Sequence, residues 1–228
     1  FQQDGFLPLV YAEWLGAGED APTVLVYCHY DVQPAEISDG WDTNPFEPVE
    51  RDGKIYARGA VDSKSHVLIN LKAVEAVIAS GNAPCNIKLL FEGEEESGSE
   101  HIFAFVEREK DLLTADAIIV SDGSLPAIEQ PILDYGLRGI ISLELTVRGP
   151  ARDLHSGHYG GSVHNPIQAL IEILATLHDD DGRITVDGFY DDVIDLSDEE
   201  RAVLDPMAAF TEQEWWDVTG AKMAWGEP

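Results

Sequence analysis

The hydrophobic pattern of the first 120 residues alternates between strand-like and helix-like segments. Short runs of apolar and β-branched side chains predict strands at residues 8–14, 23–29, 54–57, 86–91 and 115–120. Apolar positions at helical spacing predict a helix at residues 65–80, ended by Gly81, and a second helix is expected at residues 100–110. Residues 31–51 are rich in proline, glycine and aspartate and are expected to form a long loop.

Strands and helices follow one another in turn, which predicts a parallel sheet covered by helices on both sides. The run at residues 23–29 is almost wholly apolar, as expected for a strand buried on both faces. The expected fold class is therefore α/β, with a mostly parallel sheet sandwiched by helices.

The pattern changes near residues 136–139. Residues 140–147 alternate between apolar and polar side chains, which is typical of a half-exposed, antiparallel strand. A glycine-rich loop at residues 153–161 and a helix at residues 166–178 are expected to follow. We therefore expect two domains, residues 1–138 and residues 139–228.

Carboxylate and imidazole side chains gather where the predicted core strands end. They are His29, Asp31, Asp62, Glu95, Glu96 and Asp122. Five of them lie at or shortly after the ends of core strands, and Asp62 opens the helix expected at residues 65–80. Because the carboxyl ends of parallel strands meet at one edge of a sheet, we expect these side chains to lie close together.

Nitrogen and oxygen ligands without thiolate suit zinc, manganese or cobalt. A carboxylate shared by two such ions makes a dinuclear centre, which polarises a carbonyl group and activates water. Two adjacent glutamates, Glu95 and Glu96, can divide the work, one binding metal and the other moving a proton.

Each of these residues also has a simpler interpretation. His29 and Asp31 could form a structural hydrogen bond, the acidic run at residues 94–96 could begin a helix, and Asp62 could cap one. Asp122 precedes a glycine, as in a turn, and His155 in its glycine-rich loop could be a surface histidine. The position of the core residues at one sheet edge favours the metal site.

The charge of the chain excludes some partners. It carries 43 acidic and 14 basic residues, a formal net charge of −29, so neither nucleic acid nor an anionic membrane is an expected partner. The acidic surface favours solubility, and adaptation to a salty cytoplasm is an alternative interpretation. Two cysteines form no disulfide framework and no apolar run is long enough to span a bilayer, so a cytoplasmic location is expected.

Several motifs, in order along the chain, resemble one known family of enzymes. They lie at residues 29–34, 41–46, 52–64, 92–99, 120–122 and 153–157. Together they resemble the dinuclear-zinc aminoacylase and carboxypeptidase family, which includes glutamate carboxypeptidase, succinyl-diaminopimelate desuccinylase and carnosine dipeptidase. Residues 32–34 and 95–99 favour the dipeptidase-like branch. The motifs cover nearly the whole chain.

The resemblance implies a role for each candidate residue. The metal ligands would be His29, Asp62, Glu96 and Asp122, with Asp62 bridging two divalent ions, most simply zinc. Asp31 would hold the imidazole of His29, and Glu95 would be the general base and acid for attack by a metal-bound hydroxide on an amide bond. The peptide bond between Asp62 and Ser63 is expected to be cis. His155 would reach the partner's active site from a lid and dimerisation domain of α+β type, formed by residues 139–228, so a homodimer is expected.

The resemblance also implies a fifth ligand, a histidine from a C-terminal segment, which none of the seven histidines provides. The resemblance also implies an N-terminal helical region, half of the lid and a final catalytic segment that this sequence lacks, so we expect the chain to be incomplete at both ends. The expected activity is hydrolysis of dipeptides or short peptides. Alternatives are an N-acyl amino acid deacylase and, for these 228 residues alone, a non-catalytic binding or oligomerisation module.

Overall fold

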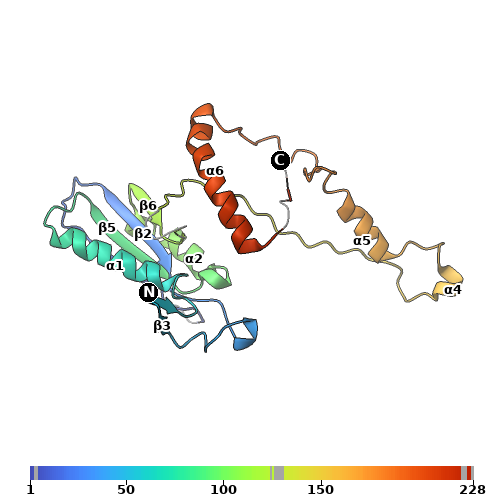
Figure 1. Cartoon of the computed structure of the whole chain (residues 1–228), viewed down its shortest axis with the longest axis horizontal. Coiled ribbons are helices and arrows are strands. Elements are labelled where there is room, and N and C mark those ends of the chain that lie inside the picture. Colours follow the sequence, from blue (N-terminus) through green and yellow to red (C-terminus); the bar gives the residue numbers. More distant parts are fainter. Residues whose placement is uncertain (3–4, 124, 126–130, 222–224, 227–228) are drawn as a thin grey trace. The chain divides into compact units, whose positions relative to one another are not determined.

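The computed structural model describes the whole chain except residues 3–4, 124, 126–130, 222–224 and 227–228 (Figure 1). The chain divides into two compact units, Phe1–Leu137 and Arg138–Pro228. The first unit contains a sheet with helices, and the second contains helices joined by long irregular segments.

The main sheet of the first unit has four strands in the order β1-β5-β2-β6. These strands are β1 (Val10–Trp14), β2 (Thr23–His29), β5 (Asn86–Glu92) and β6 (Ala117–Val120). Strands β5 and β6 run parallel to β2 on either side of it, whereas β1 is antiparallel to β5. The expected mostly parallel sheet is confirmed, and β2, β5 and β6 all end at one edge.

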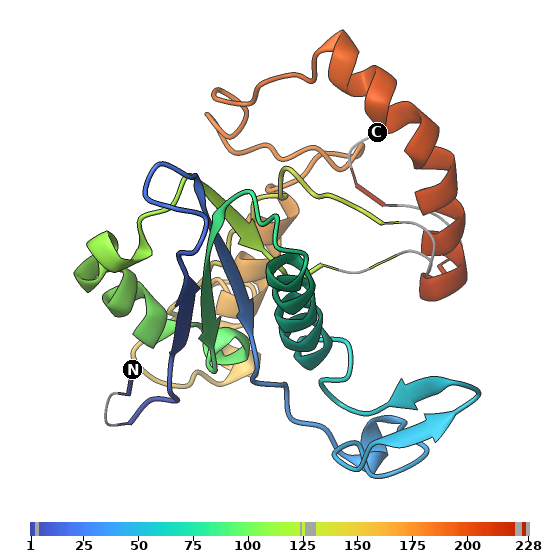
Figure 2. The same ribbon diagram turned by 90° about the vertical axis from the view of Figure 1, so that its left-hand side faces the viewer.

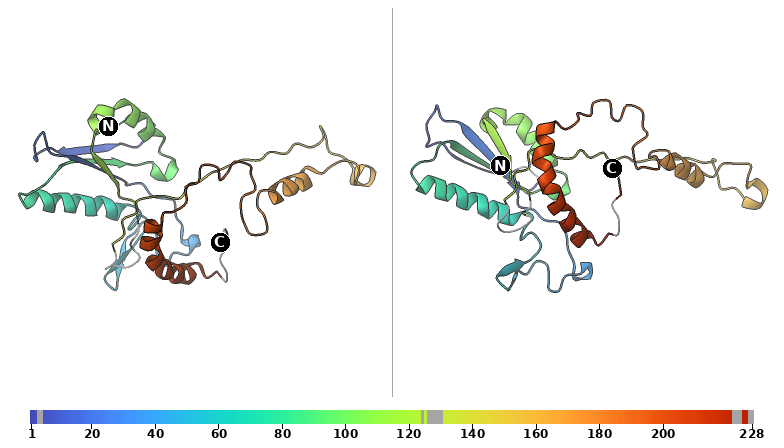
Figure 3. Two further views of the ribbon diagram at one scale, coloured as in Figure 1. Left: turned by 90° about the horizontal axis from the view of Figure 1, so that it is seen from above. Right: turned by 45° about the horizontal axis from the view of Figure 1, so that its top comes forward.

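Helices cover both faces of this sheet, as Figures 2 and 3 show. Helix α1 (Lys64–Ala79) covers one face, while α2 (Glu100–Arg108) and α3 (Lys110–Leu113) cover the other. Because side chains alternate along a strand, β5 contributes to two cores. Leu89 packs with Val67 of α1, and the next residue, Leu90, packs with Phe105 of α2.

A hairpin occupies part of the segment that the sequence predicts as a loop. Strand β3 (Val49–Arg51) pairs with β4 (Lys54–Tyr56), so the expectation of a loop through residue 51 is wrong at its end. Asp52 and Gly53 form the turn, with φ of 51° and 73°. A type I′ hairpin turn requires positive φ at both central residues, and Asp-Gly is a preferred pair there. The short helix η1 (Ile37–Asp39) lies earlier in the same segment.

The second unit contains three helices in its described residues: α4 (Ser156–Tyr159), α5 (Pro166–Ala175) and α6 (Asp198–Thr219). Helix α5 confirms the helix expected at residues 166–178, although it ends three residues early. The strand expected at residues 140–147 is wrong, because these residues form neither strand nor helix. A strand needs a paired neighbour, and the described part of this unit has only an isolated bridge between His178 and Ile184.

The sequence analysis did not predict α6, although its N-terminus carries a recognisable signal. The hydroxyl of Ser197 accepts a hydrogen bond from the backbone of Glu200, whose carboxylate accepts one from the backbone of Ser197. This reciprocal pair is a capping box.

Among the described residues, no helix combines the length and apolarity that crossing a membrane requires.

Candidate metal centre

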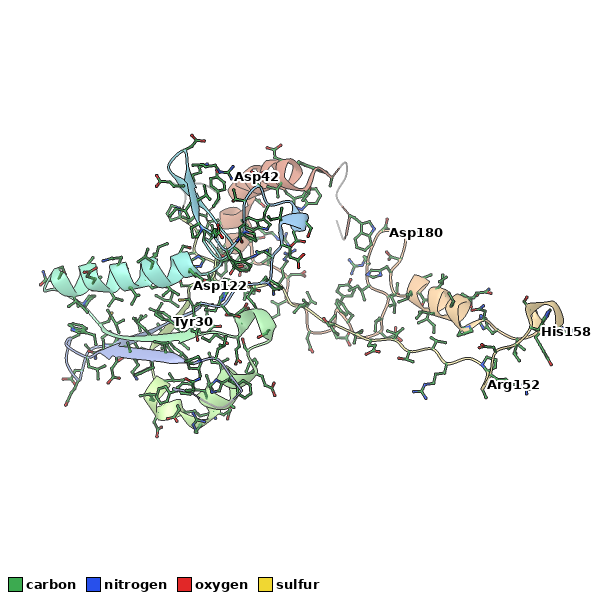
Figure 4. All side chains as sticks on the ribbon, turned by 90° about the horizontal axis from the view of Figure 1, so that it is seen from below. Tyr30, Asp42, Asp122, Arg152, His158 and Asp180 are labelled. Carbon is green, nitrogen blue, oxygen red and sulfur yellow. The ribbon has the colours of Figure 1, made fainter. Side chains whose placement is uncertain are left out.

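The candidate site lies where β2 and β6 end. His29 is the last residue of β2 and is 1% exposed, and Asp122 follows β6 by two residues. Tyr27 pairs with Val120, so the parallel register places His29 beside Asp122. Figure 4 labels Asp122 and Tyr30, which lie at this end of the sheet. The sheet register therefore brings an imidazole and a carboxylate together from separate strands.

Asp62 completes a group of three side chains. The Nε2 atom of His29 lies 2.9 Å from Oδ1 of Asp62 and 3.4 Å from Oδ1 of Asp122. One ligand atom from each residue lies within 4.8 Å of the other two, close enough to share a cation. One nitrogen and two oxygen donors suit zinc, manganese or cobalt. Two carboxylates converging on one point repel each other, so the donor set fits a divalent cation.

Asp31 orients the imidazole of His29. Its Oδ1 atom lies 3.2 Å from Nδ1 of His29, which directs Nε2 of the ring toward Asp62 and Asp122. The same carboxylate accepts hydrogen bonds from the backbone N–H of Glu95 at 3.3 Å and of Glu96 at 3.0 Å. Asp31 thus connects the end of β2 to the turn that carries both glutamates.

The acidic surroundings change the pKa of two groups at the site. Burial lowers the pKa of His29, but the carboxylates of Asp122, Asp31, Glu95 and Asp62 together raise it above the ordinary value. Burial raises the pKa of Glu95, His29 opposes this, and neighbouring carboxylates, led by Asp122, add to the rise. Burial therefore acts in opposite directions on the two groups, whereas the surrounding carboxylates raise the pKa of both.

Glu96 lies outside the group of three. It belongs to the short helix η2 (Glu95–Ser97), and its Oε2 atom accepts a hydrogen bond from the side-chain amide of Gln33 at 2.8 Å. His29, Asp62 and Asp122 are the predicted ligands that converge in the described structure, whereas Glu96 does not join them. Its assignment as a ligand of a second ion stays a prediction.

The segment that carries Asp62 begins helix α1. The peptide bond between Asp62 and Ser63 is cis, as expected, and Ser63 is fully buried. The ammonium group of Lys64 donates to the backbone carbonyl of Tyr30. The Asp62 side chain remains 63% exposed, so it approaches His29 from the solvent side of the site.

His155 lies in the second unit, at the N-terminus of α4. Its Nδ1 atom accepts a hydrogen bond from the backbone N–H of Gly157 at 3.0 Å, and Nδ1 of His158 lies 3.2 Å from it. Figure 4 labels His158 at this helix. Because Nδ1 of His155 is an acceptor, the proton of the neutral ring lies on Nε2, which can donate to another group.

Sequence analysis gave no role to Tyr27 of β2 and Glu92 of β5, which are hydrogen-bonded to each other near the carboxyl ends of these strands. The hydroxyl of Tyr27 donates to the carboxylate of Glu92, which also accepts a hydrogen bond from Ser99 at 3.0 Å. Glu92 is 1% exposed. Burial and the neighbouring Glu92 raise the pKa of Tyr27. The sequence signal was an acidic residue at the end of an apolar strand, directly before the Glu95 turn.

Comparisons with known proteins agree with this geometry. The model of the family described as Peptidase family M20/M25/M40 matches residues 25–218. The chain is 38% identical to the Cys-Gly metallodipeptidase dug1 of Schizosaccharomyces pombe over 226 residues, which are 97% of this chain and 47% of that protein. It is 42% identical to the human Beta-Ala-His dipeptidase over 196 residues, 85% of this chain and 38% of that protein.

A solved structure shares the fold. The M20 family metallo-carboxypeptidase Sso-CP2 from Sulfolobus solfataricus matches with a TM-score of 0.75 and 34% identity, over 95% of this chain and 49% of that one. The chain thus spans about half the length of the proteins that it resembles, or less.

Proposed function

The chain belongs to peptidase family M20/M25/M40, and from this premise we propose that it is the metal-binding part of a dipeptidase. The observation that carries the proposal is the convergence of His29, Asp62 and Asp122 at the carboxyl edge of the sheet. Ligand sites of open α/β sheets lie at this edge. The curated names of two relatives, Cys-Gly metallodipeptidase and Beta-Ala-His dipeptidase, support a dipeptide substrate.

The residues present fit a divalent metal, and we propose two ions, with zinc the simplest choice. His29 and Asp122 would hold one ion, Glu96 would contribute to the second, and Asp62 would bridge them. Bound ions of this kind polarise the carbonyl of the scissile amide and activate water. Asp31 keeps the His29 ring in place, a role that partners of metal ligands commonly have.

Glu95 is proposed to move the proton. Its backbone is fixed by Asp31, and its pKa is raised by burial and by the surrounding acids. A carboxyl group with a raised pKa can accept a proton from water and deliver it to the leaving amine near neutral pH. The carboxylate of the adjacent Glu96 instead accepts a hydrogen bond from Gln33. Because the two glutamates have different surroundings, we propose different roles for them.

We further propose that residues 1–138 form the catalytic domain and residues 139–228 a lid and dimerisation domain. In this proposal the Nε2–H group of His155 donates a hydrogen bond that stabilises the oxyanion of the tetrahedral intermediate in the partner's active site of a homodimer. The hydrogen bond from Gly157 to Nδ1 supports this assignment. The two cysteines, both free thiols, support a reducing compartment such as the cytoplasm.

The first test substitutes Glu95→Gln in the full-length protein. We expect hydrolysis of Cys-Gly and Beta-Ala-His to fall by at least about 100-fold, because the amide cannot accept the proton. Bound zinc, measured by elemental analysis, should stay at the wild-type level. The matched control is Glu94→Gln. The carboxylate of Glu94 accepts a hydrogen bond from the backbone N–H of Leu7, and the amide oxygen of the substituted glutamine can accept the same hydrogen bond. Full activity of Glu95→Gln would remove Glu95 from its role.

A substrate panel of dipeptides and N-acyl amino acids tests the class of substrate. Cleavage of dipeptides alone supports the dipeptidase. Cleavage of N-acyl amino acids alone would replace it with a deacylase, and wild-type protein that binds no metal would refute the metal centre itself.

A further inference from the structure

His66 joins the two segments that carry Asp62 and Asp122. It lies in the first turn of α1, and its Nδ1 atom is 2.7 Å from the hydroxyl oxygen of Ser63, the residue after Asp62. Its Nε2 atom is 2.8 Å from the carbonyl oxygen of Gly123, the residue after Asp122. One imidazole ring therefore spans the neighbours of both carboxylates.

The directions of these hydrogen bonds follow from the groups involved. A carbonyl oxygen can only accept, so Nε2 of His66 donates to Gly123. The neutral ring then accepts at Nδ1, and the hydroxyl of Ser63 donates to it. Both ring nitrogens are thus used, and each fixes one segment.

The hydroxyl of Ser63 bonds to His66 and does not cap helix α1. It is the N-cap residue of α1, where a serine hydroxyl normally accepts a hydrogen bond from the backbone two or three residues later. No such capping bond forms, because the hydroxyl is directed at the ring of His66. Stabilisation of the N-terminus of α1 therefore does not explain why the Ser63 hydroxyl is bonded to His66.

The residues on either side of Asp122 are each held by a hydrogen bond to their backbone. Strand β6 is exposed along its length, and its ladder with β2 ends at the hydrogen bond from Ser121 to the carbonyl of Tyr27. The hydrogen bond from His66 to Gly123 comes after that point and on the other side of Asp122. The backbone of Asp122 is thus held at both ends, by β2 before it and by α1 after it.

The first turn of α1 makes a second connection of the same kind. Lys64 donates to the carbonyl of Tyr30, between His29 and Asp31 in their loop. Lys64 therefore fixes the end of β2, and His66 fixes the end of β6. The segments that carry all three converging side chains are therefore connected to the first turn of α1.

We propose that His66 is a positioning residue that sets the separation of the Asp62 and Asp122 carboxylates. The proposal rests on the proposed function, in that these two carboxylates are taken as metal ligands. His66 itself contacts neither carboxylate and acts through the backbone of their neighbours.

The test compares three substitutions of His66 in the full-length protein. In His66→Gln, the side-chain NH₂ group lies near the position of Nε2 and can restore the hydrogen bond to the carbonyl of Gly123. Asn reaches only to the position of Nδ1 and can restore the contact with Ser63 alone. Ala removes both contacts. Zinc affinity is measured by titration of the metal-free protein, and the visible spectrum of the cobalt-loaded protein reports the geometry around the ion.

We expect His66→Ala and His66→Asn to weaken zinc binding at least tenfold and to change the cobalt spectrum, as loss of partners that orient ligands typically does. His66→Gln should restore most of the affinity and the wild-type spectrum. Thermal unfolding of the metal-free variants shows whether each one folds.

Wild-type affinity and spectrum in His66→Ala would overturn the proposal while leaving the metal centre intact. Equal losses in all three variants would also overturn it, because the Gly123 contact would then be irrelevant. Wild-type protein that binds neither zinc nor cobalt would instead overturn the proposed function, and with it the reason to position the carboxylates.

Discussion

Asp31 offers the sharpest test of how the site is held together, through the substitution Asp31→Asn. Its carboxylate accepts three hydrogen bonds, from the ring of His29 and from the backbone N–H groups of Glu95 and Glu96. The side chain is only 12% exposed, so water cannot easily replace a lost partner. Asparagine has nearly the same shape but a single acceptor oxygen.

The magnitude follows from the geometry of the two oxygens. Oδ1 of Asp31 serves His29 and Glu95, and Oδ2 serves Glu96. If the amide oxygen takes the Oδ1 position, the NH₂ group faces the N–H of Glu96, a donor against a donor. Loss of a hydrogen bond to a charged acceptor costs about 1.5–3 kcal/mol. The free energy of unfolding of the metal-free protein should therefore fall by this amount. The metal affinity should fall about 10- to 100-fold, because the His29 ring loses the partner that orients it.

The assays are urea unfolding in the presence of a chelator and zinc titration of the metal-free protein. Asp116→Asn is the matched control, since this exposed carboxylate accepts one backbone hydrogen bond, from Thr23 at 2.7 Å, which an amide oxygen can also accept. We expect the control to change stability by less than about 0.5 kcal/mol. If Asp31→Asn binds zinc as tightly as wild type, the assigned role of Asp31 in orienting His29 is wrong.

Two further predictions concern the fold. Phe105→Ala should destabilise the first unit by about 3–5 kcal/mol in urea unfolding, because Phe105 is fully buried in the core between α2 and the sheet. Phe103→Ala on the same helix is 69% exposed and should cost less than about 0.5 kcal/mol, and equal costs would contradict the assigned faces of α2. Ser197→Ala should destabilise α6 by about 1 kcal/mol, seen as lost helicity by circular dichroism. Hydrogen bonds from the backbone and hydroxyl of Ser197 lower the pKa of Glu200, so this capping contribution is present above the ordinary glutamate pKa and is lost as pH falls through the lowered one. Ser197→Ala should therefore show a weaker loss of helicity on acidification than wild type, and an unchanged acid profile would contradict the capping box.

Local periodicity predicted the elements of the first unit well. The expected strand at residues 23–29 is β2, and the helix expected at residues 65–80 is α1 with bounds shifted by one residue. The family resemblance drawn from the motifs is confirmed by the family model. Strand β4 matches the strand expected at residues 54–57, but its partner β3 was assigned to the loop at residues 31–51. The hairpin was therefore missed, although Asp52 and Gly53 between the two strands are a strong turn signal.

The second unit shows where periodicity fails. Residues 140–147 alternate as a strand does, yet they have no paired neighbour in the described structure. Alternation reports which face of a strand a side chain would occupy, and it does not report whether a partner strand exists. Helix α6 was missed for the opposite reason, since its acidic sequence hid a capping box at Ser197.

The sequence by itself determined the candidate residues and their order, because the residues that follow buried strands can be identified along the chain. Only the tertiary structure decided which of them meet. The register of β2 and β6 places His29 beside Asp122, the turn into α1 adds Asp62, and Glu96 is held away by Gln33. His66, which joins the segments of Asp62 and Asp122, had no role assigned to it from the sequence. The physical reason is that chain order fixes the type and spacing of side chains, whereas distances between residues far apart in sequence depend on strand register and on the contacts of backbone groups that every residue carries.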